Sequence, residues 1–107
     1  MLLILVWGCL ALACAKMQEG SQIILEGGDG SSIEGAVIIK IASDVPTESL
    51  GLEAEYGWLS VHYPKYQLVS QSLIFAKDKP YDLMVIELPD GTQQMVCFEI
   101  SSFYGKW

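Results

Sequence analysis

Apolar and polar residues alternate or cluster along the chain in a pattern that predicts several strands and one helix. An apolar, mainly β-branched run at 36–41 predicts a strand, and so do longer runs at 66–75, 81–88 and 92–100. A shorter apolar run at 22–25 predicts a further strand in front of them. The chain is therefore expected to form a sheet of four or five strands.

One segment has the period of a helix instead. Apolar side chains recur there at spacings of three and four residues, and a second apolar stripe lies beside them. The first stripe is Leu52, Tyr56, Leu59 and Tyr63, and the second is Ala54, Trp58 and Val61. Pro46 fits a first helical position, and Pro64 ends the pattern. The segment predicts an amphipathic helix of about four turns.

Turn residues set the pairing of the last strands. Residues 89–91, Pro-Asp-Gly, are typical of a three-residue hairpin loop, and residues 77–80 predict a second turn. Pairing Leu88 with Thr92 gives each of the two strands two distinct faces. One face carries Met84, Ile86, Val96 and Phe98, and the other carries Tyr81, Leu83, Val85, Met95 and Cys97.

Both faces are partly apolar, so both need a cover. We expect the helix to cover one face, and the N-terminal run, the C-terminal tail at 101–107 or a partner to cover the other. The predicted fold class is α+β, with one amphipathic helix packed on a mainly antiparallel sheet in the order β-(β)-α-β-β-β.

The first 15 residues form an uncharged apolar stretch. As a helix it would be about 22 Å long, shorter than the ~30 Å hydrocarbon core of a bilayer. It ends in small residues that fit an A-x-A cleavage site, although no Lys or Arg precedes it. We interpret 1–15 as a signal peptide cleaved near 13/14 or 15/16, 16–21 as a short tether and 22–107 as a single small domain. A retained anchor and a buried core segment are the alternatives.

Cys14 is a candidate for lipidation. Bacterial lipoproteins are cleaved just before the cysteine that carries the lipid, and Ala-Leu-Ala-Cys at 11–14 matches the preferred pattern in part. Lipid on Cys14 would anchor the domain, since each buried CH₂ contributes roughly 0.8 kcal/mol. If Cys14 is retained without lipid, a disulfide with Cys97 is the alternative in an oxidising compartment.

Charge and composition exclude some classes of partner. The formal net charge is −7, with six lysines and no arginine. Nucleic-acid binding needs clustered cations, and so does electrostatic attachment to an anionic membrane. We therefore expect no nucleic-acid partner and no contact with a membrane except through a lipid on Cys14.

The glycine-rich stretch GGDGSS at 27–32 has two interpretations. It lacks the lysine and the following helix of a phosphate-binding loop, and Gly and Asp are ordinary turn residues. It therefore predicts mainly a turn before a strand. As an alternative, Asp29, Ser31 and Glu34 are candidate ligands for an ion or a small molecule, although the calcium-loop spacing is not met.

Residue types that commonly take part in catalysis are few in this chain. His62 is the only histidine, and a dyad with Cys97 is disfavoured because Cys97 lies within an apolar strand. Asp82 and Glu99 are expected to point to opposite faces, and the carboxylates in general are expected on the solvated surface. We predict no catalytic residue, no metal site and no cofactor, and we favour a role other than that of an enzyme.

Aromatic residues are numerous for a domain of this size. Tyr and Trp are common at binding hot spots but also in cores. The best candidates for a contact patch are Trp58, Phe103, Tyr104 and Trp107.

The series GGDGSS, AVIIKIA, AEYGWL, YPKYQLVSQSLI, KPYDLMVIELPDGT and FEISSFYGK runs from Gly27 to Lys106. It resembles a family of small exported bacterial proteins of unknown function. The resemblance implies a compact domain and supplies no activity, ligand or catalytic residue.

We therefore expect an exported binding or structural domain of a bacterial envelope, with an unknown protein partner there. It would be periplasmic, extracellular or anchored through Cys14. Two alternatives remain. The first is a ligand- or ion-dependent module or small enzyme that uses the GGDGSS loop, and the second is an inhibitor or immunity-type protein.

Overall fold

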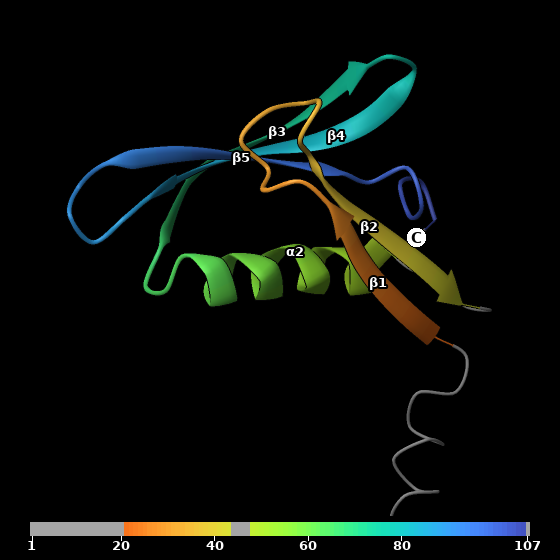
Figure 1. Ribbon diagram of the computed structural model, residues 1–107. Coiled ribbons are helices and arrows are strands. Elements are labelled where there is room, and N and C mark those ends of the chain that lie inside the picture. Colours follow the sequence, from red (N-terminus) through yellow and green to blue (C-terminus); the bar gives the residue numbers. More distant parts are fainter. Residues whose placement is uncertain (1–20, 44–47, 107) are drawn as a thin grey trace, which may run out of the picture.

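The computed structural model describes residues 21–43 and 48–106, which form a five-stranded sheet and one helix (Figure 1). The strands are β1 Ser21–Gly27, β2 Val37–Ser43, β3 Gln67–Ala76, β4 Lys79–Glu87 and β5 Gln93–Glu99, and the helix is α2 Glu48–His62. The predicted signal peptide and Pro46 lie outside the described residues. The predicted α+β class is confirmed, including the additional short strand at the start.

The strand order across the sheet is β1-β2-β5-β4-β3. The pairs β1–β2, β3–β4 and β4–β5 are antiparallel, and β2–β5 is parallel. The chain therefore builds one half of the sheet from the β1–β2 hairpin and the other from the β3–β4–β5 meander, and α2 connects the two halves. Strands β1 and β3 are the two edges.

The helix lies across one face of the sheet (Figure 1). The core between them is centred on Leu59 of α2 and Phe98 of β5, and Trp58 meets Phe98 edge to face at 5.6 Å between ring centroids. The full buried set is Val37, Ile39, Trp58, Leu59, Met84, Ile86, Val96, Phe98, Ile100 and Phe103. This core includes all four residues of one predicted face, Met84, Ile86, Val96 and Phe98, so this is the face that α2 covers.

The predicted turns and register are confirmed. Met84 pairs with Val96 and Tyr81 pairs with Glu99, as the Leu88–Thr92 register requires. Gly91 takes the left-handed conformation with φ 88°, which closes the 89–91 loop. In the 77–80 turn, Lys77 and Asp78 also have positive φ, which matches the twist of a tight two-residue hairpin.

The buried stripe of α2 differs in part from the predicted one. Leu59 and Trp58 are buried as expected, but Tyr56 and Val61 are exposed. The buried side also includes Gly51 and Glu55, which do not belong to the predicted apolar stripes. The helix is therefore rotated so that a glycine and a carboxylate face the sheet.

The cover of the second face was not anticipated correctly. Phe103 of the tail does not lie there, because it packs in the core on the α2 side. The loop between β1 and β2 covers part of that face instead: Ala36 packs with Tyr81 and Cys97, and Ile33 packs against them. A nine-residue loop thus covers part of the second face, and a partner on the rest of it stays a prediction.

The two halves of the sheet meet along a short seam. Only Val37–Phe98 and Ile38–Glu99 pair as strand residues between β2 and β5. Beyond one end, Cys97 N donates to Gly30 O at 2.7 Å. Beyond the other end, Ser102 Oγ accepts from Ile41 N at 2.8 Å and donates to Ile41 O at 3.2 Å. A loop carbonyl and a serine hydroxyl therefore extend the seam where strand pairing ends.

Ser102→Ala is expected to lower the free energy of unfolding by about 2 kcal/mol, because it leaves both backbone groups of Ile41 without their partner. Urea denaturation measures the change. Ser101→Ala is the matched control, since the Ser101 hydroxyl bonds only Glu99 at the surface. Its expected change is within about 0.5 kcal/mol. Equal losses for the two variants would contradict the role given to Ser102.

Candidate binding site at the open sheet edge

Two carboxylates are buried between α2 and the sheet, where we expected only solvated acids. Glu55 projects from the buried side of α2 and has an exposed fraction of 0%. Asp82 lies in β4 on the face that carries Met84, and it is 7% exposed. Glu48, in the first turn of α2, is half-buried. The expectation of solvated acids is therefore wrong for Glu55 and Asp82.

No N–H or hydroxyl group of the described residues donates to either oxygen of Glu55 or to the buried Oε2 of Glu48. The partner of Glu55 is the Asp82 carboxyl, to which a protonated Glu55 donates a hydrogen bond. Burial raises the pKa of the Glu55 carboxyl to about 10, and the neighbouring Asp82 and Glu48 carboxyls add to the effect. Burial also raises the pKa of Glu48, with a smaller contribution from Asp82. The three acids thus form one interacting group, the acid cluster, in which Glu55 is neutral at pH 7.

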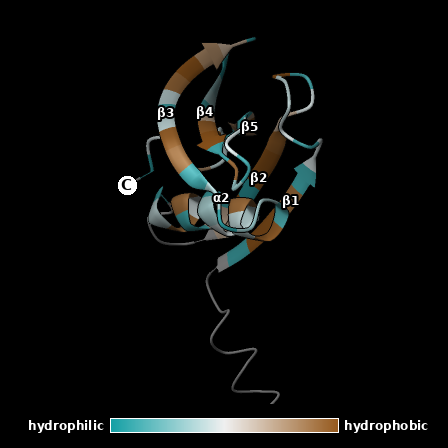
Figure 2. Ribbon diagram, turned by 90° about the vertical axis from the view of Figure 1, so that its left-hand side faces the viewer, coloured by the Kyte–Doolittle hydropathy of each residue, from teal (hydrophilic) through white to brown (hydrophobic). Residues whose placement is uncertain are grey.

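Strand β3 lies next to this cluster and forms an edge of the sheet (Figure 2). Its ten residues, QLVSQSLIFA, include no charged residue, no proline and no glycine. Edge strands that stay unpaired are commonly protected by charges, prolines or bulges. Here the register shifts only between Leu68 and Ser70, so the strand runs regularly from Ser70 to Ala76. This edge has little protection against pairing with another strand.

Apolar side chains extend along the helix-facing side of β3. Leu73 pairs with Asp82 and is 46% exposed, and Phe75 two residues on is 63% exposed. The Phe75 ring meets Tyr104 edge to face at 5.6 Å. From the helix, the exposed Tyr56 donates its hydroxyl hydrogen to Gln71 Oε1 at 3.0 Å. We call Tyr56, Leu73, Phe75 and Tyr104 the edge patch.

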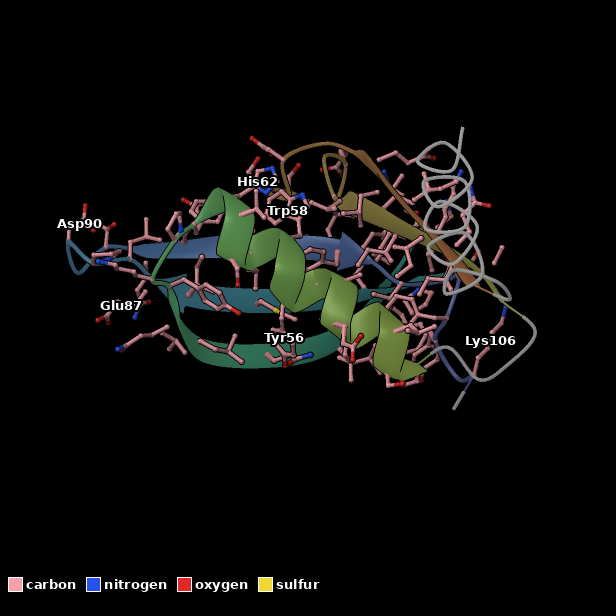
Figure 3. All side chains as sticks on the ribbon, turned by 90° about the horizontal axis from the view of Figure 1, so that it is seen from below. Tyr56, Trp58, His62, Glu87, Asp90 and Lys106 are labelled. Atoms are coloured by element: carbon pink, nitrogen blue, oxygen red, sulfur yellow. The ribbon has the colours of Figure 1, made fainter. Side chains whose placement is uncertain are left out.

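The edge patch and the buried indole lie on different sides of α2. Figure 3 shows Tyr56 on the β3 side of the helix, and Trp58 with His62 on the β1–β2 side. Trp58 is 9% exposed and stacks on His62 at 3.9 Å. Phe103 is fully buried, so both rings belong to the core rather than to a surface patch. Of the four predicted contact residues, Tyr104 is exposed and Trp107 lies outside the described residues.

The polar side chains of Asp29 and Ser31 in the GGDGSS loop form hydrogen bonds within the loop itself. Asp29 Oδ1 accepts from Ser31 N at 3.0 Å and from Ser31 Oγ at 2.7 Å, and these bonds lower the pKa of Asp29. Asp90 and Thr92 make the same pair of bonds in the hairpin loop, where they stabilise a turn. Glu34 forms an exposed ion pair with Lys77 at 3.5 Å. A ligand site at Asp29, Ser31 and Glu34 stays a prediction.

A shallow cavity of about 150 Å³ lies between α2 and the β1–β2 hairpin. Its lining residues are Leu25, Glu26, Gly27, Gly28, Val37 and Trp58. It therefore reaches the first glycines of the GGDGSS loop but not the three candidate ligands. Pockets for small molecules usually measure about 300 Å³ or more, so this cavity is too small to indicate one.

The remaining candidates for chemistry lie apart. Cys97 is a buried free thiol on the face opposite α2, and burial raises its pKa, with a smaller effect of Glu34. His62 lies on α2, where Nδ1 is 2.9 Å from Trp58 O. The sheet therefore separates the two side chains. Within residues 21–43 and 48–106, no three His, Cys, Asp or Glu side chains are arranged to hold a metal ion.

Comparison with protein-family models, with curated proteins and with solved structures finds no match to this chain. In the part of the chain that the structure describes, no helix has the length and apolar character needed to cross a membrane. The candidate site is therefore described from its geometry alone.

The sequence held a signal for the open edge but not for the acid cluster. A ten-residue strand without a charge can be read directly from residues 67–76. Its position at the edge depends on β5 pairing with both β2 and β4. The burial of Glu55 could not be predicted from the sequence, because a glutamate on a helix is normally exposed to solvent.

Proposed function

We propose that this protein is a small binding module of a bacterial envelope that takes an extended segment of a partner protein as an added strand beside β3. The observation that carries the proposal is the uncharged, exposed β3 edge with its apolar edge patch. Main-chain hydrogen bonds supply affinity in strand addition, and side chains on alternate positions supply specificity. The apolar N-terminal stretch at 1–15 supports export.

The geometry of the edge favours an extended partner over a compact one. Seven successive β3 residues, 67–73, are exposed, and the regular stretch from Ser70 to Ala76 offers continuous backbone groups. Leu73 and Phe75 lie at alternate positions on one side, so an added strand would meet two apolar side chains and the polar Gln71 beside them. The ring of Tyr104 extends this surface beyond Phe75.

The proposal is tested with a display library of random ten-residue peptides selected on the full domain. Selected peptides are expected to protect β3 amides from hydrogen exchange. Phe75→Lys should weaken their binding at least tenfold, about 1.4 kcal/mol, because it removes an exposed apolar contact and adds a charge to the edge. The variant should fold normally, since Phe75 is 63% exposed.

Val61→Lys is the control, because Val61 is an exposed apolar residue of α2 that does not belong to the edge patch. Its binding is expected to stay within twofold of the wild type. Peptides that protect β1 rather than β3, or a library that yields no binder, would contradict strand addition at β3.

A further inference from the structure

We infer that a second copy of this chain pairs with strand β1, so that two domains join edge to edge as a dimer with two-fold symmetry. The inference is independent of strand addition at β3, because β1 and β3 are opposite edges of the sheet (Figure 2). Its basis is a regular, exposed β1 edge whose sequence is complementary to itself, beside a shallow cavity that side chains of the second copy would cover.

Strand β1 also has little protection against pairing with another strand. It pairs with β2 along all seven residues, 21–27, without a shift of register. It contains no proline, and its one charged residue, Glu26, forms an ion pair with Lys40 of β2 at 2.6 Å. Charges, prolines and bulges are the usual features that keep an edge strand single. The outward backbone groups of β1 are therefore available to another strand.

The apolar side chains of β1 are left open. Ile23, Ile24 and Leu25 are 43%, 46% and 45% exposed, and among the described residues neither core cluster includes one from β1. Leu25 pairs with Ile39, a core residue below α2, so Leu25 and Ile23 lie on the α2 side of the sheet. Contiguous exposed apolar residues of this kind mark interaction surfaces.

The sequence of β1 is complementary to itself in an antiparallel pair. In the register centred on Ile24, Ile24 faces Ile24 of the second copy, and Ile23 faces Leu25. Gln22 faces Glu26, so an amide lies opposite the carboxylate. The two Glu26 side chains are then four residues apart along the ladder, ~14 Å, which is beyond the ~8 Å Debye length. A two-fold interface requires such a self-complementary surface.

The charge distribution favours this edge for contact between two copies. The net charge of −7 makes two copies repel each other over most of their surface. Strands β1 and β2 together carry one acid and one lysine, Glu26 and Lys40, and these two form an ion pair. The β1–β2 hairpin is therefore a neutral surface, where the repulsion between copies is small.

The shallow cavity between α2 and the hairpin lies beside the same edge. Leu25, Val37 and Trp58 supply apolar lining, and Gly27 and Gly28 leave it open on the hairpin side. Ile23 of the second copy, opposite Leu25, would lie at its mouth. A cavity of about 150 Å³ can hold a group the size of benzene, so this one has room for an aliphatic side chain.

The dimer would be a continuous sheet of ten strands, because each copy contributes five. Strand β3 of each copy would form an outer edge of this sheet. The dimer would therefore leave both β3 edges free and offer two equivalent sites for an extended segment. Two linked sites raise the overall affinity for a partner that carries two such segments.

The first test measures the mass of the protein in solution by light scattering over the micromolar range. It uses the full-length gene product, with its N-terminus defined by intact mass, and the wild type is expected to be a dimer. Ile24→Glu should weaken dimerisation at least tenfold, because it places two carboxylates directly opposite each other. Within one copy the new carboxylate faces Lys40, so the variant should fold normally. Phe75→Lys, on the other edge, is the control and should leave the dimer intact.

A second test checks the register. Ile24→Cys should form a disulfide between two copies under mild oxidation, because directly opposite Cα atoms are about 4.5–5.5 Å apart, within the range of a disulfide. Ile23→Cys is the matched control. It faces Leu25 of the second copy, so the two introduced thiols lie on a diagonal of ~7–8 Å and should not join. The wild type, treated in the same way, gives the background from its native cysteines.

The outcomes separate the two proposals. A monomer over the whole concentration range, or a dimer that Ile24→Glu leaves intact, would overturn pairing at β1. Loss of the dimer in Phe75→Lys would assign the interface to β3 and overturn it as well. Ile24→Glu should still bind β3-directed peptides within twofold of the wild type per chain, so strand addition at β3 can succeed or fail independently.

Discussion

Glu55→Gln is expected to raise the free energy of unfolding by about 3 kcal/mol at pH 7. The Glu55 carboxyl has a pKa of about 10 in the folded protein, because burial and the neighbouring Asp82 and Glu48 disfavour its charge. In the unfolded chain its pKa is near 4.5. Folding at pH 7 therefore requires Glu55 to take up a proton, and glutamine, which has the shape of the protonated acid, removes that requirement.

The sign of the pH dependence follows from the raised pKa. The contribution of Glu55 to the free energy of unfolding of the wild type is most favourable below pH 4.5, where Glu55 is protonated in both the folded and the unfolded state. Between pH 4.5 and about 10 the folded state binds the additional proton, so stability falls by roughly 1.4 kcal/mol per pH unit from this group. The advantage of the glutamine variant should therefore be near zero at pH 4 and grow as the pH rises.

Urea denaturation of the two proteins at pH 4, 5.5, 7 and 8.5 measures this change. Glu53→Gln, the exposed acid of the same helix, should show a difference within about 0.5 kcal/mol at every pH. An advantage for Glu55→Gln that is the same at pH 4 and pH 8.5 would show that the carboxyl group is not protonated by folding.

Phe103→Ala is expected to lower the free energy of unfolding by about 3–5 kcal/mol, the usual range for removing a fully buried aromatic ring. The Phe103 ring packs directly over Gly51 of α2, where any side chain would collide with it. Gly51→Ala alone should cost about 1–3 kcal/mol, because overpacking outweighs the ~1 kcal/mol gain in helix propensity.

The double variant Gly51→Ala/Phe103→Ala separates this contact from general damage to the core. With the ring removed, the new methyl group fills part of the cavity, so the combined loss should be smaller than the sum of the two single losses. Thermal or urea denaturation of the four proteins gives the coupling energy. Strict additivity would contradict the close approach of α2 and the tail at Gly51.

Local signals in the sequence were sufficient for the turns and for pairing within the meander. The 89–91 loop fixes how β4 and β5 face each other, because a tight hairpin leaves little choice of register. Alternation along the strands then gives the members of the two faces, but not which face α2 covers. These features depend on residues close together in sequence.

The parts that could not be predicted depend on distant contacts. Hydropathy placed Tyr56 in the buried stripe of α2, but Tyr56 is exposed, Glu55 is buried and Phe103 packs over Gly51. The cover of the second face depends on how the loop returns to β5, where Gly30 O meets Cys97 N. Neither contact can be predicted from the periodicity of apolar residues in the sequence.

The short seam between β2 and β5 has a consequence for the order of folding. The strands β3, β4 and β5 are neighbours in sequence, whereas the contact of Ile41 with Ser102 spans 61 residues. Contacts between distant residues form slowly because a long loop must close first. The meander is therefore expected to be structured in the transition state while the β1–β2 hairpin is still detached. Substitutions in the seam would then mainly accelerate unfolding, and those in the meander would slow folding.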